Sequence, residues 1–224
     1  MQTQNSSRVR LGALALGISA LLFAAFPLVR PFFPIPDANS PASLTVATQA
    51  LSSSAWVVSH FIAMIALVLL LFGMLTLYAR LTNTRAERRA FLAMIFGLAG
   101  ITLILPALGV ETYTLPVVGK TYLEGQTNVI SIVFLIYSGP DNLVLLLGLL
   151  LLAIGAIVLA FAVWRSGVLP KWAGVIFAIG LALWFPLFPQ MIRIVDGLLI
   201  GIGGVWLAWS MWQETPGGEP GAAL

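Results

Sequence analysis

The chain has 224 residues, of which 60% are hydrophobic and only 8% are charged. A soluble domain carries about 25% charged residues, so the composition excludes an ordinary water-soluble fold and predicts an all-α integral membrane protein. No cysteine and one histidine are present, which excludes disulfides, thiolate catalysis and metal sites built from several His or Cys ligands. The net charge of +3 comes from basic residues in short loops, so it indicates membrane orientation rather than nucleic-acid binding.

Six apolar runs are long enough to cross a bilayer, because roughly 20 helical residues span about 30 Å of hydrocarbon. The predicted spans are residues 11–29, 55–79, 90–110, 143–164, 172–188 and 194–212. They predict a single six-helix domain over residues 1–212, followed by a disordered cytoplasmic tail over 213–224 that is rich in glycine and proline. We expect the first run to be retained rather than cleaved as a signal peptide, because its apolar core exceeds the usual length of about 7–15 residues.

The basic residues predict the orientation of these spans. If the N-terminus is inside, eight of the 11 basic residues lie on the cytoplasmic side, namely Arg8, Arg10, Arg80, Arg85, Arg88, Arg89, Arg165 and Lys171. Positive charge favours the cytoplasmic side of a membrane. The pattern therefore predicts a multi-pass protein of a bacterial inner or plasma membrane with both termini cytoplasmic.

Two pairs of spans resemble each other. When the chain is shifted by 80 residues, Arg85 falls on Arg165, and "GITLILP" from Gly100 falls on "GLALWFP" from Gly180. This similarity indicates a tandem repeat of helical hairpins, in which the second and third spans match the fourth and fifth. Chance similarity among common membrane residues is the alternative.

The predicted outer loops are longer than the inner ones. We expect residues 30–54 to be largely irregular, because proline and serine are frequent there. The stretch from Glu111 to Asn142 holds a predicted small hairpin around Val118–Gly119, or a coil, and then an apolar run at 129–137 that is too short to cross. That run is predicted to be an interfacial helix, with a re-entrant segment as the alternative.

Small residues predict where helices approach closely. Gly174, Ala178 and Ala182 recur every four residues in the fifth span, and Gly197 and Gly201 do so in the sixth. Because lipid supplies no hydrophobic force between helices, such stripes favour close backbone contact. We expect them to pair the last two spans in an antiparallel arrangement, with a homodimer face as the alternative.

Five ionisable residues lie near the predicted outer ends of the spans: His60, Glu111, Asp141, Arg193 and Asp196. Ionisable residues in membrane segments are costly and often functional. We therefore hypothesise an outward-facing polar rim, in which a His60–carboxylate pair serves as a pH sensor. The alternative is that these side chains simply reach water, with Arg193 and Asp196 as an ordinary surface pair.

These features favour a non-catalytic membrane protein, either a subunit of a membrane complex or a binder of a small apolar or lipid ligand. Its predicted partners are the bilayer, and as alternatives other membrane subunits or a second copy. A small transporter built from the repeated hairpins and a membrane enzyme acting on a lipid or isoprenoid are the other hypotheses. No catalytic residue, metal site or cofactor is predicted. A haem or chlorophyll held by His60 alone is a weak alternative, because one imidazole in an apolar helix is common.

The stretch Trp164–Gly180, "WRSGVLPKWAGVIFAIG", has a specific junction pattern of Arg-Ser followed by a hydrophobic residue, proline, a basic residue and tryptophan. The pattern resembles the turn between the fourth and fifth helices in an uncharacterised family of bacterial six-helix integral membrane proteins. The residues that fit it are Arg165, Ser166, Leu169, Pro170, Lys171 and Trp172. The resemblance implies a six-helix architecture and no particular activity.

Overall fold

The computed structural model describes residues 2–185 and 188–213. Within these ranges all regular elements are helical, which confirms the prediction of an all-α fold. The elements are α1 (Gln2–Val29), α2 (Pro41–Leu51), α3 (Ser54–Leu81), α4 (Glu87–Leu123), the 3₁₀ turn η1 (Thr127–Val129), α5 (Ile130–Ser138), α6 (Pro140–Ser166), α7 (Lys171–Leu183) and α8 (Gln190–Gln213). The predicted tail lies outside the described residues, except for Gln213 at the end of α8.

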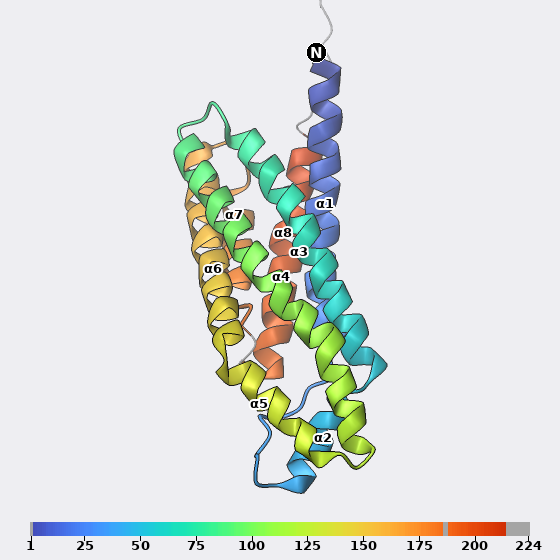
Figure 1. The fold of residues 1–224 in the computed structure, drawn as a ribbon. Helices are drawn as coiled ribbons and strands as arrows, with labels where there is room; N and C mark the ends of the chain where they lie inside the picture. Colours follow the sequence, from blue (N-terminus) through green and yellow to red (C-terminus); the bar gives the residue numbers. More distant parts are fainter. Residues whose placement is uncertain (1, 186–187, 214–224) are drawn as a thin grey trace, which may run out of the picture.

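Six helices form a closed ring in which chain neighbours are also neighbours in space (Figure 1). The ring runs α1, α3, α4, α6, α7 and α8, and α8 packs back against α1. Five of these helices, all except α7, are long and apolar enough to cross a membrane. The chain is therefore an α-helical bundle with several helices of membrane-spanning length.

Helix α7 is the short member of the ring. It has 13 residues, which corresponds to about 20 Å of helix, whereas the hydrocarbon core is about 30 Å thick. The predicted span at 172–188 is thus a shorter helix that ends at Leu183. The sequence explains the early end, because prolines follow at 186 and 189 and disfavour helical backbone in the residue before them. The prediction of six long spanning helices therefore holds for five of them.

The segments outside the ring are more helical than predicted. Helix α4 continues to Leu123 and includes Pro106 and Pro116, so the predicted hairpin or coil around Val118–Gly119 is wrong. The predicted irregular loop contains α2, whose N-cap Ser40 accepts a hydrogen bond from the backbone N–H of Ser43. A capping side chain of this kind starts a helix even in a loop rich in proline and serine.

Helices α2 and α5 lie together with the end of α4, at the end of the bundle opposite the N-terminus (Figure 1). We call this layer, made of α2, η1, α5 and residues 112–123 of α4, the cap. It has its own small core, which consists of Leu51, Trp56, Leu115, Val118 and Val133. Val133 is the one buried residue of α5. Because a re-entrant segment must be surrounded by protein, this exposure favours the interfacial helix over the re-entrant alternative for residues 129–137.

The small-residue stripes pack closely, but not against each other as predicted. A Cβ placed on Gly197 or Gly201 would contact α1, and one on Gly174 would contact Val163 of α6. Ala178 is buried, whereas Ala182 is exposed. These faces of α8 and α7 are covered mainly by other helices of the same chain, so they do not form the alternative dimer face.

The contact between α7 and α8 instead uses Gly180 and Gly203, and its spacing matches the contact between α4 and α6. In the α7–α8 contact, Gly180 lies against Asp196 and Ile200, and Gly203 lies against Ala173 and Phe177. In the α4–α6 contact, Gly100 lies in the same way against Gly148 and Leu152, and Gly155 lies against Ala93 and Gly97. The shift of 80 residues thus relates α4 to α7, while α6 corresponds to α8. The predicted pairing of α3 and α4 with α6 and α7 stays a prediction, and α4 has 37 residues against 13 in α7.

These crossings make a testable prediction about α4. A Cβ at Gly100 would lie 2.6 Å from the backbone nitrogen of Leu152, whereas nothing lies within 4 Å of a Cβ at Gly109. We expect Gly100→Ala to destabilise the fold by about 1–3 kcal/mol because the helices must separate. Thermal unfolding in detergent measures the change, with Gly109→Ala in the same helix as the control. Equal unfolding temperatures for the two variants would contradict the crossing.

Candidate binding site at the capped end of the bundle

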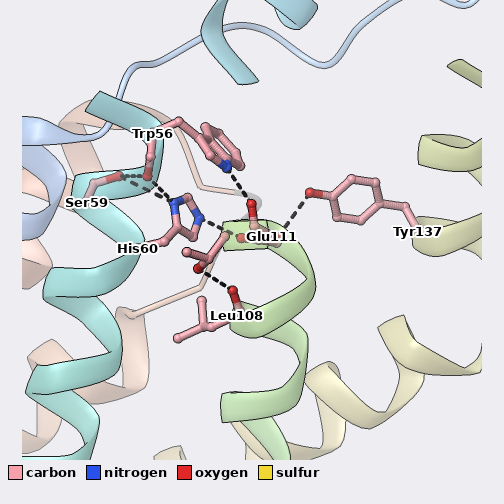
Figure 2. Close-up of polar contacts among 7 residues, drawn as sticks. Trp56, Ser59, His60, Leu108, Glu111 and Tyr137 are labelled. Atoms are coloured by element: carbon pink, nitrogen blue, oxygen red, sulfur yellow. Dashed lines mark hydrogen bonds and ion pairs between the residues drawn. The ribbon is translucent and has the colours of Figure 1, made fainter. Parts of the chain in front are cut away.

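The site is organised around a histidine–glutamate pair in which the side chain of His60 is buried and that of Glu111 is 13% exposed. His60 on α3 is fully buried, with 0% of its surface exposed, and its Nε2 lies 2.7 Å from Oε2 of Glu111 on α4 (Figure 2). Its Nδ1 lies 2.7 Å from the backbone carbonyl oxygen of Trp56. The prediction that His60 belongs to a polar rim open to the outside is therefore wrong, because the cap covers this end of α3.

The geometry fixes the net charge of the pair. A carbonyl oxygen only accepts hydrogen bonds, so Nδ1 of His60 carries a proton for Trp56. One further proton joins Nε2 to the carboxylate of Glu111. Whichever atom holds that proton, the pair is either imidazolium with carboxylate or imidazole with carboxylic acid. Both forms have zero net charge, which is the cheapest state for ionisable groups removed from water.

Glu111 is also held by residues that the sequence analysis missed. The hydroxyl of Tyr137 on α5 donates to Oε1 of Glu111 at 3.0 Å, and Nε1 of Trp56 donates to the backbone carbonyl of Glu111 at 2.8 Å (Figure 2). Three helices, α3, α4 and α5, therefore meet at one carboxylate. The only sequence signal was the position of Trp56, four residues before His60 and so on the same face of its helix.

A cavity of about 40 Å³ adjoins the pair at the end of the bundle where α7 has stopped. That volume has room for roughly three water-sized groups. Most of its wall is apolar or aromatic. The lining residues are Phe26, Arg30, His60, Ile104, Leu108, Glu111, Leu145, Leu149, Trp184, Phe185 and Arg193.

Two arginines face this cavity. Arg193 on α8 is 8% exposed, and its guanidinium stands over the ring of Phe26 at 5.4 Å. Arg30, which follows α1, stands over the ring of Trp56 at 4.5 Å. Burial lowers the pKa of Arg30, and the charge of Glu111 opposes that shift. Glu111 forms its ion pair with His60, and no salt bridge joins either guanidinium to a carboxylate within the described residues.

The other two predicted rim residues lie outside this cavity. Asp196 is 1% exposed and sits at the α7–α8 crossing, and its Oδ2 has no hydrogen-bond partner among the described residues. The proposed surface pair of Arg193 and Asp196 is therefore wrong, since both side chains are buried. Asp141 is exposed and lines a second, smaller cavity that also contacts Glu111 and Tyr137. The structure thus brings His60, Glu111 and Arg193 together and leaves the two aspartates apart.

The arrangement bears on the metal and cofactor hypotheses. No group of three or more His, Cys, Asp or Glu residues that could hold a metal ion occurs in the part of the chain that the structure describes. Both ring nitrogens of His60 are engaged in hydrogen bonds. Axial ligation of a haem or chlorophyll would therefore require one of these bonds to break. The prediction that the chain carries no cofactor stays a prediction.

Comparison with known proteins adds no relative: no protein-family model, no curated protein and no solved structure matches this chain. The resemblance of the Trp164–Gly180 turn to an uncharacterised family thus stays a prediction. The turn itself has a structural reason, since Lys171 lies 5.6 Å from the ring of Trp164 and Gly167 ends α6 with a left-handed φ of 71°. The site at the capped end is therefore the basis for the proposed function.

The buried pair predicts strong coupling between two substitutions. His60→Ala or Glu111→Ala alone leaves a polar partner buried without its hydrogen bond, and each is expected to cost about 3–5 kcal/mol. The double variant should cost clearly less than the sum, because no orphaned partner remains. Chemical or thermal unfolding of the four proteins in detergent measures this cycle. Additive effects would show that the pair is not formed.

The link between Tyr137 and Glu111 predicts a smaller effect. Tyr137→Phe removes the hydroxyl and is expected to cost about 0.5–1.5 kcal/mol, and to increase protease cleavage or hydrogen exchange in α5. Tyr113→Phe is the matched control, because Tyr113 lies on the exposed surface of α4, 61% exposed. Identical exchange in the two variants would mean that the hydroxyl does not hold the cap.

Proposed function

We propose that this chain is a non-catalytic multi-pass membrane protein that binds a largely apolar ligand, such as a lipid, and holds the small polar end of that ligand in the cavity at the capped end. Ligand sites are typically concave and apolar, with a few polar groups that fix orientation. The cavity has this character, with aliphatic and aromatic walls and polar groups from His60, Glu111 and the two arginines. It also lies in the one part of the ring where a helix has ended early.

A single observation carries the non-catalytic part of this proposal: the hydrogen-bonding atoms of the buried pair are already used. Both nitrogens of His60 and both carboxylate oxygens of Glu111 have partners within the protein. The hydroxyl of Ser59 donates to the carbonyl of Trp56. A general base needs a lone pair directed at its substrate. These groups are directed at other protein groups, so they favour a structural and orienting role over the membrane-enzyme alternative.

The transporter alternative receives little support from the middle of the bundle. Transport of a polar solute requires polar groups along a path through the membrane. The hydroxyls of Thr76 and Thr102 instead donate to carbonyls of their own helices, at 3.0 and 2.8 Å. We therefore favour a binder, or a subunit that presents this site within a larger membrane complex or a homodimer.

We further propose that the chain crosses a bacterial plasma membrane six times, with both termini in the cytoplasm. The fifth crossing would consist of α7 and the residues after it. Lys171 at the start of α7 lies beside Trp164 at the far end of α6, whereas Trp184 lines the cavity at the capped end. The segment from Lys171 to Trp184 thus runs from that end of α6 to the cavity. The cap and the cavity would then face the outside.

The absence of native cysteine allows a direct test of this topology. Arg85→Cys places a thiol in the exposed turn between α3 and α4, and Asn39→Cys places one in the exposed segment before α2. In intact cells, a membrane-impermeant maleimide should label the second thiol and not the first. Labelling of the first thiol from outside would reverse the proposed orientation.

The cavity itself is tested by filling it. Leu149 lines the cavity and is 7% exposed, whereas its neighbour Leu150 is 56% exposed on the outer surface of α6. We expect Leu149→Trp to abolish ligand that co-purifies with the full chain, as measured by native mass spectrometry, because the added indole occupies the space. Leu150→Trp should retain it. Equal ligand occupancy in both folded variants would exclude this cavity as the binding site.

A further inference from the structure

We propose that the ligand of this cavity presents an anionic head group, a carboxylate or a phosphate, to Arg30, Arg193 and the indole N–H of Trp184. The inference rests on the proposed binding function and adds the chemical class of the ligand's polar end. Three features of the cavity support it: a donor without a partner, two guanidinium groups without a salt bridge, and a neighbouring acid–base pair that contributes no net charge.

The first feature is Trp184. Its side chain is 8% exposed and lines the cavity, yet its Nε1 has no hydrogen-bond partner within the described residues. Edge-to-face contact with Phe23, at 5.1 Å between ring centroids, holds the indole in place. An unsatisfied buried N–H costs about 1–3 kcal/mol. Nε1 is itself almost inaccessible to water-sized groups, so a ligand oxygen would reach this donor after a small shift of the side chains around it.

The second feature is the pair of arginines. The guanidinium carbon of each arginine lies over an aromatic ring, at 4.5 Å from the centroid of Trp56 for Arg30 and at 5.4 Å from that of Phe26 for Arg193. A cation–π contact does not use the hydrogen-bonding capacity of a guanidinium, whose N–H groups match carboxylate and phosphate oxygens. Nε of Arg30 has no partner among the described residues. The two guanidiniums repel each other, whereas Asp196 and Glu111 attract Arg193, and an anion close to both guanidiniums would further relieve the repulsion.

The third feature is the balance of charge. The His60–Glu111 pair is neutral in either protonation form, because one proton is shared between its two acceptors. Its carboxylate accepts hydrogen bonds from His60 and Tyr137 and forms no salt bridge with either arginine, and it attracts Arg30 and Arg193 only at longer range. Asp196 does not line the cavity. The cavity wall thus has two positive charges, and even an ionised Asp196 nearby leaves an excess of one.

The test compares ligands that differ only in charge, with the full chain in nanodiscs of zwitterionic phosphatidylcholine. The probes are radiolabelled oleate against oleyl alcohol, and dioleoyl phosphatidic acid against dioleoylglycerol, at a pH where the acids are ionised. We expect the charged member of each pair to bind at least about tenfold more tightly. Arg193→Gln and Trp184→Phe should each reduce that preference, since each removes donors to the anion.

The controls keep the inference separate from protein stability. Arg165→Gln removes an exposed arginine at the opposite end of α6, and Trp206→Phe removes an indole N–H from the outer face of α8, so both should leave the preference unchanged. Trp184→Phe retains an aromatic ring, and gel filtration confirms that it is folded. If Arg193→Gln does not fold, Trp184→Phe alone still tests the donor set.

The outcomes distinguish this inference from the proposed function. If Leu149→Trp abolishes binding but charged and uncharged probes bind equally to the natural sequence, the cavity binds ligand and the anionic head group is wrong. If no probe binds the natural sequence more tightly than it binds the Leu149→Trp variant, both proposals fail. If inorganic phosphate abolishes the preference for charged probes, the site recognises the anion alone. If the preference persists in the presence of inorganic phosphate, the site recognises an anionic lipid.

Discussion

The hydrogen bond between His60 and Glu111 is the constraint on which the capped end depends. It joins α3 to α4 at 2.7 Å, and through Tyr137 and Trp56 it also fixes α5 and the start of α3. In a low-dielectric interior such a network is strong when complete and costly when any member is missing. The pair therefore selects one relative position of α3 and α4, and that position determines the shape of the cavity beside it.

The cavity exists because one helix of the ring is short. Glycines at 180 and 203 let the backbones of α7 and α8 approach closely, and the prolines at 186 and 189 prevent α7 from continuing. Beyond Leu183, side chains such as Trp184 occupy part of the space that another helical turn would fill. Trp184 and two arginines consequently line a site with largely apolar walls, where electrostatic interactions are stronger than in water.

Much of the fold was predictable from the sequence, and the errors in the prediction have physical causes. Hydropathy measures whether a segment tolerates lipid, so it located the long helices correctly. It does not measure helix ends, which depend on caps and prolines. The predicted span ended at residue 110, yet α4 continues through Pro106 and Pro116 to Leu123, and it packs against α2, α3 and α6. The stripe at Gly197 and Gly201 was correctly identified as a packing surface, but the partner helix is α1 rather than α7.

By itself the sequence determined the helical class, the apolar character of the long helices and three members of the site, His60, Glu111 and Arg193, because rare ionisable residues stand out in apolar segments. Only the tertiary structure decided that His60 is buried, that Glu111 is its partner, and that Arg30, Tyr137 and Trp184 belong to the same end. The physical reason is that this end carries a cap, which is formed by helices from segments that the hydropathy pattern assigns to loops. Burial and hydrogen-bond partners depend on such contacts between distant segments, and a hydropathy pattern contains no information about them.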